Sequence, residues 1–251
     1  MRLAFLSDIH FGREQDLNAW DFACQLLAAV KVDRVFLGGD IFDTTAASDY
    51  IKTLKDEDSL QGEIDEGKAH LAELVQVLPK AQFQFYLGNH EERIERLIKS
   101  KVRALASLRA IQPAKLFDLD DLGIQTLPCR KPIKVGHLYL AHGHEFATGG
   151  ASPAHTALNS VNSNILFGHV HRVSVSHKRQ LDGRLIGAWS NSCLSSLQPE
   201  YTKPRPDWTQ GFTLVDFTKS GNFRVSPVIF WGEGEELLTI IDGKEYAKKG
   251  K

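Results

Sequence analysis

The chain has 251 residues, 42% of them hydrophobic, which is long enough to bury a large core as the single domain that we expect over residues 1–251. Its 30 Lys and Arg nearly balance its 31 Asp and Glu, and a net charge of -1 provides no overall field to attract nucleic acid or anionic membranes. The three cysteines have no metal-binding spacing, and Asp8 interrupts the apolar start too early for a signal peptide or a membrane span. We therefore expect a cytoplasmic protein without a membrane partner.

The first predicted elements alternate between strand and helix. Residues 3–7 form a short apolar run that indicates a strand. Residues 16–30 repeat apolar side chains at helical spacing, with Leu17, Trp20, Cys24 and Leu27 on one face. Residues 35–39 then indicate a second strand. This alternation favours an α/β protein with parallel strands.

The next region is rich in charge. Residues 44–68 include the acidic groups 56–58 and 63–66, so we expect an exposed helical excursion with a solvated face. From His70 a second amphipathic helix is predicted, and Pro79 ends it before a strand at residues 83–87. Residues 91–109 indicate a further helix with one apolar stripe.

The second half adds shorter elements. Strands are predicted at residues 123–127, 137–140 and 165–167, with a helix at 153–161. Residues 173–177 and 184–189 flank Asp182-Gly183, which is a strong hairpin signal. Residues 212–217 and 223–231 flank a second turn at 219–221. Antiparallel strands are therefore expected beyond residue 173.

Short polar motifs follow five of the predicted strands. A carboxylate at such a buried strand end is costly unless it is paired or bound to metal, which directs attention to Asp40 at the end of the second strand. The two imidazoles of His169 and His171, one residue apart after a glycine, form a metal clip. No thiolate lies in any motif, which favours Mn, Fe or Zn over a structural thiolate-bound zinc. The motif residues are Asp8, His10, Asp40, Asn89, His90, His142, His144, His169 and His171.

In this order the motifs resemble the calcineurin-like metallophosphoesterase family, and short elements such as residues 208–212 look like bacterial and phage members. The resemblance implies a four-layer α/β fold of two facing mixed β-sheets flanked by helices. It implies two divalent metal ions, Mn above all, with Fe, Zn or Ni as alternatives. One ion would be held by Asp8, His10, Asp40 and His171, and the other by Asp40, Asn89, His142 and His169, with Asp40 bridging.

The resemblance also implies catalytic roles. A hydroxide bridging the two ions would attack phosphorus in line, His90 would donate a proton to the leaving oxygen or stabilise the transition state, and Asp43 would orient His90. Capping of a helix start is the alternative role for His90. His144 is the alternative to His142 as a ligand. Protein phosphatases of the family carry an Arg directly after the aspartate that corresponds to Asp43, whereas this chain has Thr44.

Several substrates fit this chemistry. We expect hydrolysis of phosphodiesters, with monoesters as additional substrates, of small or nucleotide-like molecules. A DNA or RNA nuclease of the repair type is the alternative, because residues 125–224 carry eleven Lys and Arg against five Asp and Glu. A non-catalytic scaffold ranks last because His90 is present. The oligomeric state is left open.

Two segments are candidates for the walls of the substrate pocket. They are the charged residues 44–68 and the proline-rich residues 199–208, where Tyr201 and Trp208 are available to stack on a base. Packing of this loop on the sheet is an equally good interpretation of the two aromatic residues. Arg13 and Arg172 are candidates for gripping the phosphate.

Overall fold

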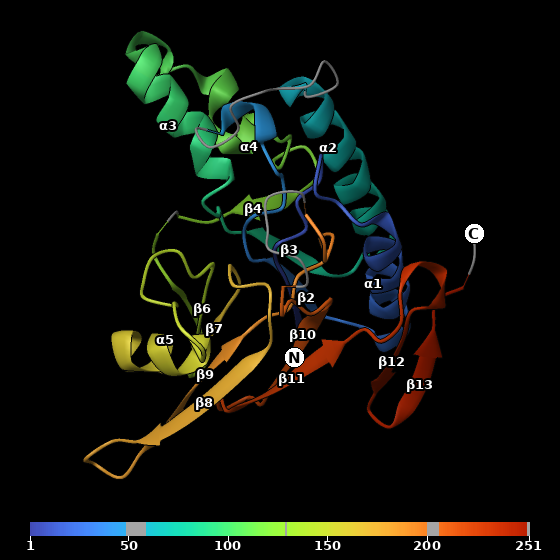
Figure 1. Cartoon of the computed structure of the whole chain (residues 1–251), viewed down its shortest axis with the longest axis vertical. Helices are drawn as coiled ribbons and strands as arrows, with labels where there is room; N and C mark the ends of the chain where they lie inside the picture. Colours follow the sequence, from blue (N-terminus) through green and yellow to red (C-terminus); the bar gives the residue numbers. More distant parts are fainter. Residues whose placement is uncertain (49–58, 129, 200–205, 250–251) are drawn as a thin grey trace.

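A computed structural model describes residues 1–48, 59–128, 130–199 and 206–249, which form two large mixed β-sheets and a small two-stranded sheet (Figure 1). The first sheet has six strands in the order β11-β10-β1-β2-β3-β4. Its parallel strands are β1 (Arg2–Leu6), β2 (Arg34–Leu37), β3 (Gln82–Phe85) and β4 (Ile124–Thr126). The antiparallel strands β10 (Gly211–Phe217) and β11 (Phe223–Ile229) continue the sheet beyond β1.

The second sheet has five strands in the order β5-β6-β7-β9-β8. Strands β6 (Leu138–Ala141), β7 (Ile165–Phe167) and β9 (Leu185–Ser190) are parallel, whereas β5 (Ile133–Val135) and β8 (Ser174–Arg179) pair antiparallel at the edges. The expected hairpin around Asp182-Gly183 is confirmed as β8–β9. A separate hairpin, β12 (Leu238–Ile241) and β13 (Lys244–Ala247), closes the described chain.

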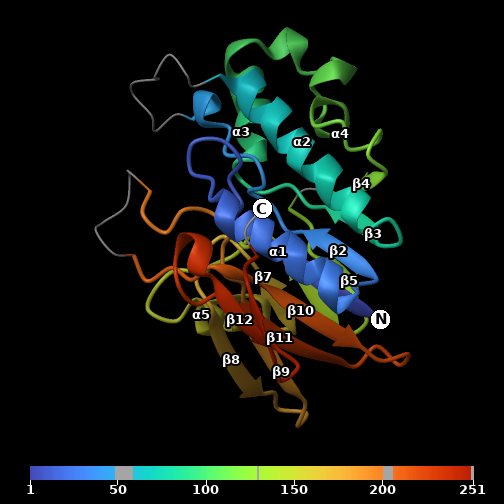
Figure 2. The ribbon, with the colours of Figure 1, turned by 90° about the vertical axis from the view of Figure 1, so that its right-hand side faces the viewer.

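Alternation along the strands produces four layers. In β1, Leu3 and Phe5 enter the core between the two sheets, while Ala4 and Leu6 face the core beneath helices α1 (Leu17–Val30) and α2 (Leu60–Val77). Across the second sheet, residues such as Phe167 pack against α5 (Pro153–Val161). Figures 1 and 2 show α1 and α2 on the outer face of the first sheet, with α5 outside the second. The expected fold of two facing mixed sheets flanked by helices is confirmed.

Local signals set the start and the spacing of the helices. The carboxylate of Asp16 accepts from the backbone N–H groups of Asn18 and Ala19 and so caps α1, which begins one residue later than predicted. Helix α5 has the predicted bounds, with Pro153 at its first position. Within α2, a Cβ on Gly67 would lie 2.4 Å from the ring of Phe42, so only glycine allows this close approach.

The charged region departs from the prediction. Helix α2 begins at Leu60, ten residues before the expected start, and Glu63, Ile64 and Gly67 are buried. Residues 60–68 are helical with a solvated face, as predicted, since Gln61, Gly62, Asp65 and Glu66 are exposed. The opposite face is not exposed, because Glu63 is buried and accepts hydrogen bonds from the backbone N–H of Thr45 at 3.0 and 3.2 Å. Residues 49–58 lie outside the described chain. The turn η1 (Thr45–Ala47) precedes them.

Helix α3 (Glu91–Lys101) is shorter than predicted. Its apolar stripe does not continue, because Val102 and Leu105 are exposed and the chain turns through η2 (Arg103–Leu105), η3 (Arg109–Ile111) and α4 (Pro113–Leu116). The sequence prediction also missed β5, β12, β13 and the turn η4 (Gly234–Glu236), which have only three or four residues each and largely exposed or half-buried side chains. No helix in the described part of the chain has the length and hydropathy that a membrane span needs.

Candidate metal centre

The five polar motifs meet at the carboxyl ends of the strands. Asp8 follows β1, Asp40 follows β2, and the Asn89-His90 pair follows β3. From the second sheet, His142 follows β6, and His169 and His171 follow β7. The loops are joined directly, since the backbone N–H of Asp8 donates to Gly39 O at 3.0 Å and that of Ile9 donates to Asp40 O at 2.9 Å. Parallel strands that share an edge bring these side chains together.

One group consists of Asp8, His10 and His171, which are all buried. The Nε2 atoms of His10 and His171 are 3.3 Å apart, and His171 Nε2 lies 3.3 Å from Asp8 Oδ1. One ligand atom from each residue lies within 4.8 Å of the other two. This spacing suits a single ion bound by one carboxylate and two imidazoles.

A second group consists of Asp40, His142 and His169. The Nε2 of His142 lies 3.1 Å from Asp40 Oδ2 and 3.1 Å from the amide oxygen of Asn89. Asp40 also belongs to a group with His10 and His90, in which His90 Nε2 lies 3.7 Å from Asp40 Oδ2. The Asp40 carboxylate therefore lies between the two halves of the cluster.

Outer contacts orient the imidazoles. The Nδ1 of His142 lies 2.9 Å from Gly38 O, and the Nδ1 of His10 lies 3.2 Å from Asp43 Oδ1. Each contact leaves Nε2 facing the cluster, which is the usual arrangement of a metal-binding histidine and its supporting acceptor. Together with carboxylate and amide oxygens, these nitrogens fit divalent ions such as Mn, Fe or Zn.

The backbone of the cluster is strained. Positive φ angles occur at Asp8 (56°), His10 (56°), Asp40 (52°), His169 (70°) and His171 (57°). Residues other than glycine rarely adopt this left-handed conformation, which costs of order 1–3 kcal/mol at sparsely populated positions. Such strain persists only where the surrounding structure enforces it, and it concentrates at functional sites.

Burial and charge act against each other in the cluster. Burial alone would raise the pKa of Asp8, but the neighbouring His171 lowers it to about 2. Burial likewise opposes the charged form of His142 and of His171, yet Asp40 and Asp8 raise their pKa values to about 10. Burial and the charge of His142 lower the pKa of His169 to about 4. The carboxylates are therefore anionic and attract cations.

Glu91 supports the loops and was missed as a site residue. Its carboxylate is buried and accepts four backbone N–H groups, from Asp40, Ile41, Phe42 and Gly88, at 2.7–3.0 Å. Burial and the charge of Asp40 raise the pKa of Glu91. Its position directly after His90, at the acidic start of α3, was the available signal, but the four partners come from the fold.

His90 and Asp43 are in contact, as expected. Asp43 Oδ1 lies 3.0 Å from His90 Nδ1, and Asp43 Oδ2 accepts from the hydroxyl of Thr45 at 2.7 Å. Asp43 also contacts His10, so one carboxylate orients two imidazoles. Burial opposes the charged form of His90, but the charges of Asp40 and Asp43 raise its pKa. Arg93, which the sequence prediction missed, lies with a terminal nitrogen 2.7 Å from His90 Nε2.

The structure separates the remaining candidates. His144 Nε2 faces Glu92 at 3.5 Å, whereas His142 faces Asp40, which favours His142 as the ligand. Arg172 forms an ion pair with Asp207 and donates to Gly150 O at 2.7 Å. The ring of Trp208 lies 4.1 Å from that of His171, and Tyr201 lies outside the described residues. The role of Arg13 in binding the phosphate stays a prediction.

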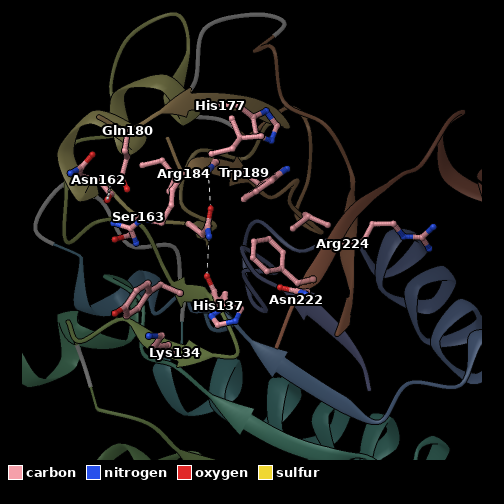
Figure 3. A pocket seen from close by; sticks show the side chains of 17 residues that line it. Lys134, His137, Asn162, Ser163, His177, Gln180, Arg184, Trp189, Asn222 and Arg224 are labelled. Carbon is pink, nitrogen blue, oxygen red and sulfur yellow. Dashed lines mark hydrogen bonds between the residues drawn. The ribbon is translucent and has the colours of Figure 1, made fainter. Parts of the chain in front are cut away.

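One large cavity lies away from the cluster. A cavity of about 940 Å³ opens at the other end of the second sheet and is lined by residues such as Lys134, Trp189 and Arg184 (Figure 3). A smaller one of about 320 Å³ borders His169, Arg172 and Trp208. Only the smaller cavity touches a residue of the metal cluster, so the larger volume does not mark the chemistry.

Two facing sheets with Asp, His and Asn side chains gathered at their strand ends are the architecture of a metal-dependent hydrolase of phosphoric esters. Residues 1–188 match the family model of the calcineurin-like phosphoesterase superfamily domain. The chain belongs to this superfamily, and it is a metal-dependent phosphoric ester hydrolase. No curated protein matches the chain.

Solved structures with a similar arrangement include three proteins of low sequence identity. The phosphoesterase YfcE from E. coli has 16% identity and a TM-score of 0.41, over 86% of this chain and 88% of its own. A dimetal phosphatase from Danio rerio has 10% identity and a TM-score of 0.45, over 86% and 92%. The NAD nucleotidase NadN from Haemophilus influenzae has 12% identity and a TM-score of 0.43, over all of this chain but 54% of its own.

Proposed function

We propose that the protein hydrolyses phosphodiesters, and monoesters in addition, of small or nucleotide-like molecules with the aid of two divalent metal ions. The observation that carries this proposal is the position of Asp40, whose carboxylate lies between the two groups of metal-ligating side chains. Asp8, His10, Asp40 and His171 would hold one ion, and Asp40, Asn89, His142 and His169 the other. Manganese is the ion that we expect first.

When bound, the two ions would acidify a water molecule and neutralise charge on the phosphoryl group. The protein residues provide the remaining chemistry. His90 Nε2, on the edge of the cluster, is placed to act on the leaving oxygen, and Asp43 fixes its ring through Nδ1. The hydroxyl of Thr44 donates to His90 O at 2.7 Å, which holds the backbone of His90 as well.

The preference for diesters follows from the sparse cationic surroundings. The second charge of a monoester gains little where few cations face the phosphate, and Arg172 is already paired with Asp207. Trp208 borders the cavity next to His169 and offers an aromatic face to a base or an aromatic leaving group. Nucleotide-like diesters therefore fit the site best.

A nuclease is the second candidate, favoured by the basic excess in residues 125–224. Several of those cations have carboxylate partners, however. Arg130 pairs with Glu92, Arg184 with Asp182, and Arg224 with Asp216. Cations that are already neutralised release few counterions on binding DNA, so duplex DNA should bind weakly. The scaffold alternative ranks below both because His90 and the ligand set are complete.

We also infer that the chain is one domain, since β10, beyond the family match, pairs with β1 at its start.

The proposed function is tested with matched monoesters and diesters, cyclic nucleotides and DNA, each with Mn, Fe, Zn or Ni. We expect diester hydrolysis to equal or exceed that of monoesters. A tenfold preference for monoesters would replace this proposal with a phosphatase, and tight, salt-sensitive binding of duplex DNA would replace it with a nuclease.

A further inference from the structure

Arg93 contacts the edge of the metal cluster through His90. It lies one turn into α3, three residues after His90, and its side chain is only 13% exposed. One terminal nitrogen, Nη2, lies 2.7 Å from His90 Nε2, and the other, Nη1, donates to the backbone oxygen of Asp43 at 3.0 Å. The guanidinium is therefore fixed at the tip of the His90 ring, on the side that faces Asp40.

Both acceptors of this largely buried guanidinium are uncharged. Five other arginines of the described chain lie within 2.9 Å of a carboxylate: Arg2, Arg130, Arg172, Arg184 and Arg224. By contrast, the carboxylate closest to Arg93 belongs to Asp43 and lies 3.9 Å away. That carboxylate already contacts His10, His90 and Thr45. A largely buried cation without a close anion is costly, so the position favours an incoming anion.

In the described part of the chain, Arg93 has free N–H donors with which to bind an incoming anion. A guanidinium has five N–H donors and accepts no hydrogen bond. Within the described residues its short contacts use one donor on each terminal nitrogen, and three donors are left. In this arrangement His90 Nε2 must be the acceptor, so the leaving oxygen can use it only after Arg93 has turned that donor elsewhere.

We propose that Arg93 binds a nonbridging phosphoryl oxygen of the substrate. The contact gives the guanidinium its anion and moves its Nη2 donor away from His90 Nε2, which must then take a proton from water before it can donate to the leaving oxygen. Monoesters and diesters both carry a nonbridging oxygen, so Arg93 assists both classes, and one such cation leaves the surroundings of the phosphate sparse in positive charge. The inference rests on the proposed phosphoesterase function and adds one substrate-binding residue to it.

The test compares Arg93→Ala with Arg96→Ala, a matched control that removes the same charge from an exposed position on α3. For Arg93→Ala we expect kcat/KM to fall about a hundredfold for a monoester and a diester alike, the usual scale for one lost donor. Competitive inhibition by inorganic phosphate should weaken about tenfold, while the metal content stays unchanged. Arg93→Lys should recover only part of the loss, since an ammonium lacks the planar fork. Arg96→Ala should behave as the wild type.

A double-mutant cycle with His90→Ala distinguishes binding from mere support of the ring. If Arg93 touches the substrate, the effects of Arg93→Ala and His90→Ala on kcat/KM should combine to a larger loss than either alone. If the double variant is no slower than His90→Ala, and phosphate inhibition is unchanged, Arg93 only positions His90 and the proposal is overturned. Absence of hydrolysis by the wild type would instead reject the proposed function itself.

Discussion

The two ends of the facing sheets differ in backbone strain and in buried charge. At the carboxyl ends, five site residues have left-handed backbone, and buried carboxylates face buried imidazoles at 3.1–3.3 Å. At the opposite end, the larger cavity is lined by regular strands, and its arginines are neutralised by Asp182, Asp216 and Asp242. The functional end is thus marked by backbone strain and buried charge, and not by volume.

The contrast has an energetic reason. Each strained residue and each buried charge lowers the stability of the fold, so such features last only where other contacts hold them. Glu91 provides part of that support at the functional end through its four backbone partners. The arginines of the opposite end need no such device, because Arg184 and Arg224 are exposed and paired with carboxylates. The following changes test this difference.

Removal of the shared carboxylate should have the largest effect. We expect Asp40→Asn to lower the metal content of the purified protein and to reduce kcat/KM by about a thousandfold or more, the upper scale for one lost electrostatic group. Chelation of the wild type should abolish turnover as well. Elemental analysis of protein purified with excess metal provides the measurement, and Asp182→Asn at the opposite end is the control. Two ions and normal turnover in Asp40→Asn would show that Asp40 does not bridge.

Replacement of the buried Glu91 carboxylate should have the second largest effect. In Glu91→Gln the new amide NH2 must face two backbone N–H groups, either those of Ile41 and Phe42 or those of Asp40 and Gly88. We expect the free energy of unfolding to fall by about 3 kcal/mol, the scale for unsatisfied buried polar groups. Urea denaturation measures it. Glu95→Gln, on the exposed face of α3, should change it by less than about 0.5 kcal/mol, and an equally small change in Glu91→Gln would refute the supporting role.

Removal of His90, the candidate general acid, should slow turnover without removing metal. We expect His90→Ala to keep both ions and to lose about a hundredfold in kcat, as is usual for a lost general acid. The loss should shrink with substrates whose leaving groups need no protonation. His155→Ala, on α5, provides the control. Equal losses for good and poor leaving groups would mean that His90 binds or positions the substrate instead.

The smallest effect is expected at the opposite end. Lys134 lines the large cavity and lies 5.6 Å from the ring centre of Tyr139. We expect Lys134→Ala to keep kcat/KM on small diesters within about twofold. Substitutions on the surface, away from buried cores and buried polar networks, rarely have large effects. Steady-state kinetics is sufficient. A tenfold loss would make this cavity part of the substrate site and would break the contrast between the two ends.

The sequence predicted the parts of the site that local rules determine. Asp8, Asp40 and His142 could be found because each follows an apolar strand, and the ends of parallel strands meet. Helix α5 was predicted over residues 153–161, and the β8–β9 hairpin carried a clear signal in Asp182-Gly183. Their existence and order therefore needed no knowledge of packing.

Other parts depend on tertiary contacts. Helix α2 begins early because Glu63 binds the Thr45 backbone and Gly67 receives the Phe42 ring, and neither partner is near in sequence. Arg93 lies at the i, i+3 spacing from His90 that brings side chains together on a helix, but only the fold brings Asp43 O to it. The approach of His10 to Asp43 likewise cannot be derived from spacing alone.

The pairing of β10 with β1 has a consequence for the order of folding during synthesis. The Asp8 loop is held by the late chain, since the backbone N–H of Leu194 donates to Asp8 O at 3.0 Å and Thr213 pairs with Phe5. Every metal-ligating residue has left the ribosome well before these partners. The cluster therefore cannot reach its final geometry until about residue 217 has emerged, and contacts this distant in sequence make folding slow. We therefore expect metal loading to be one of the last events in the maturation of the chain.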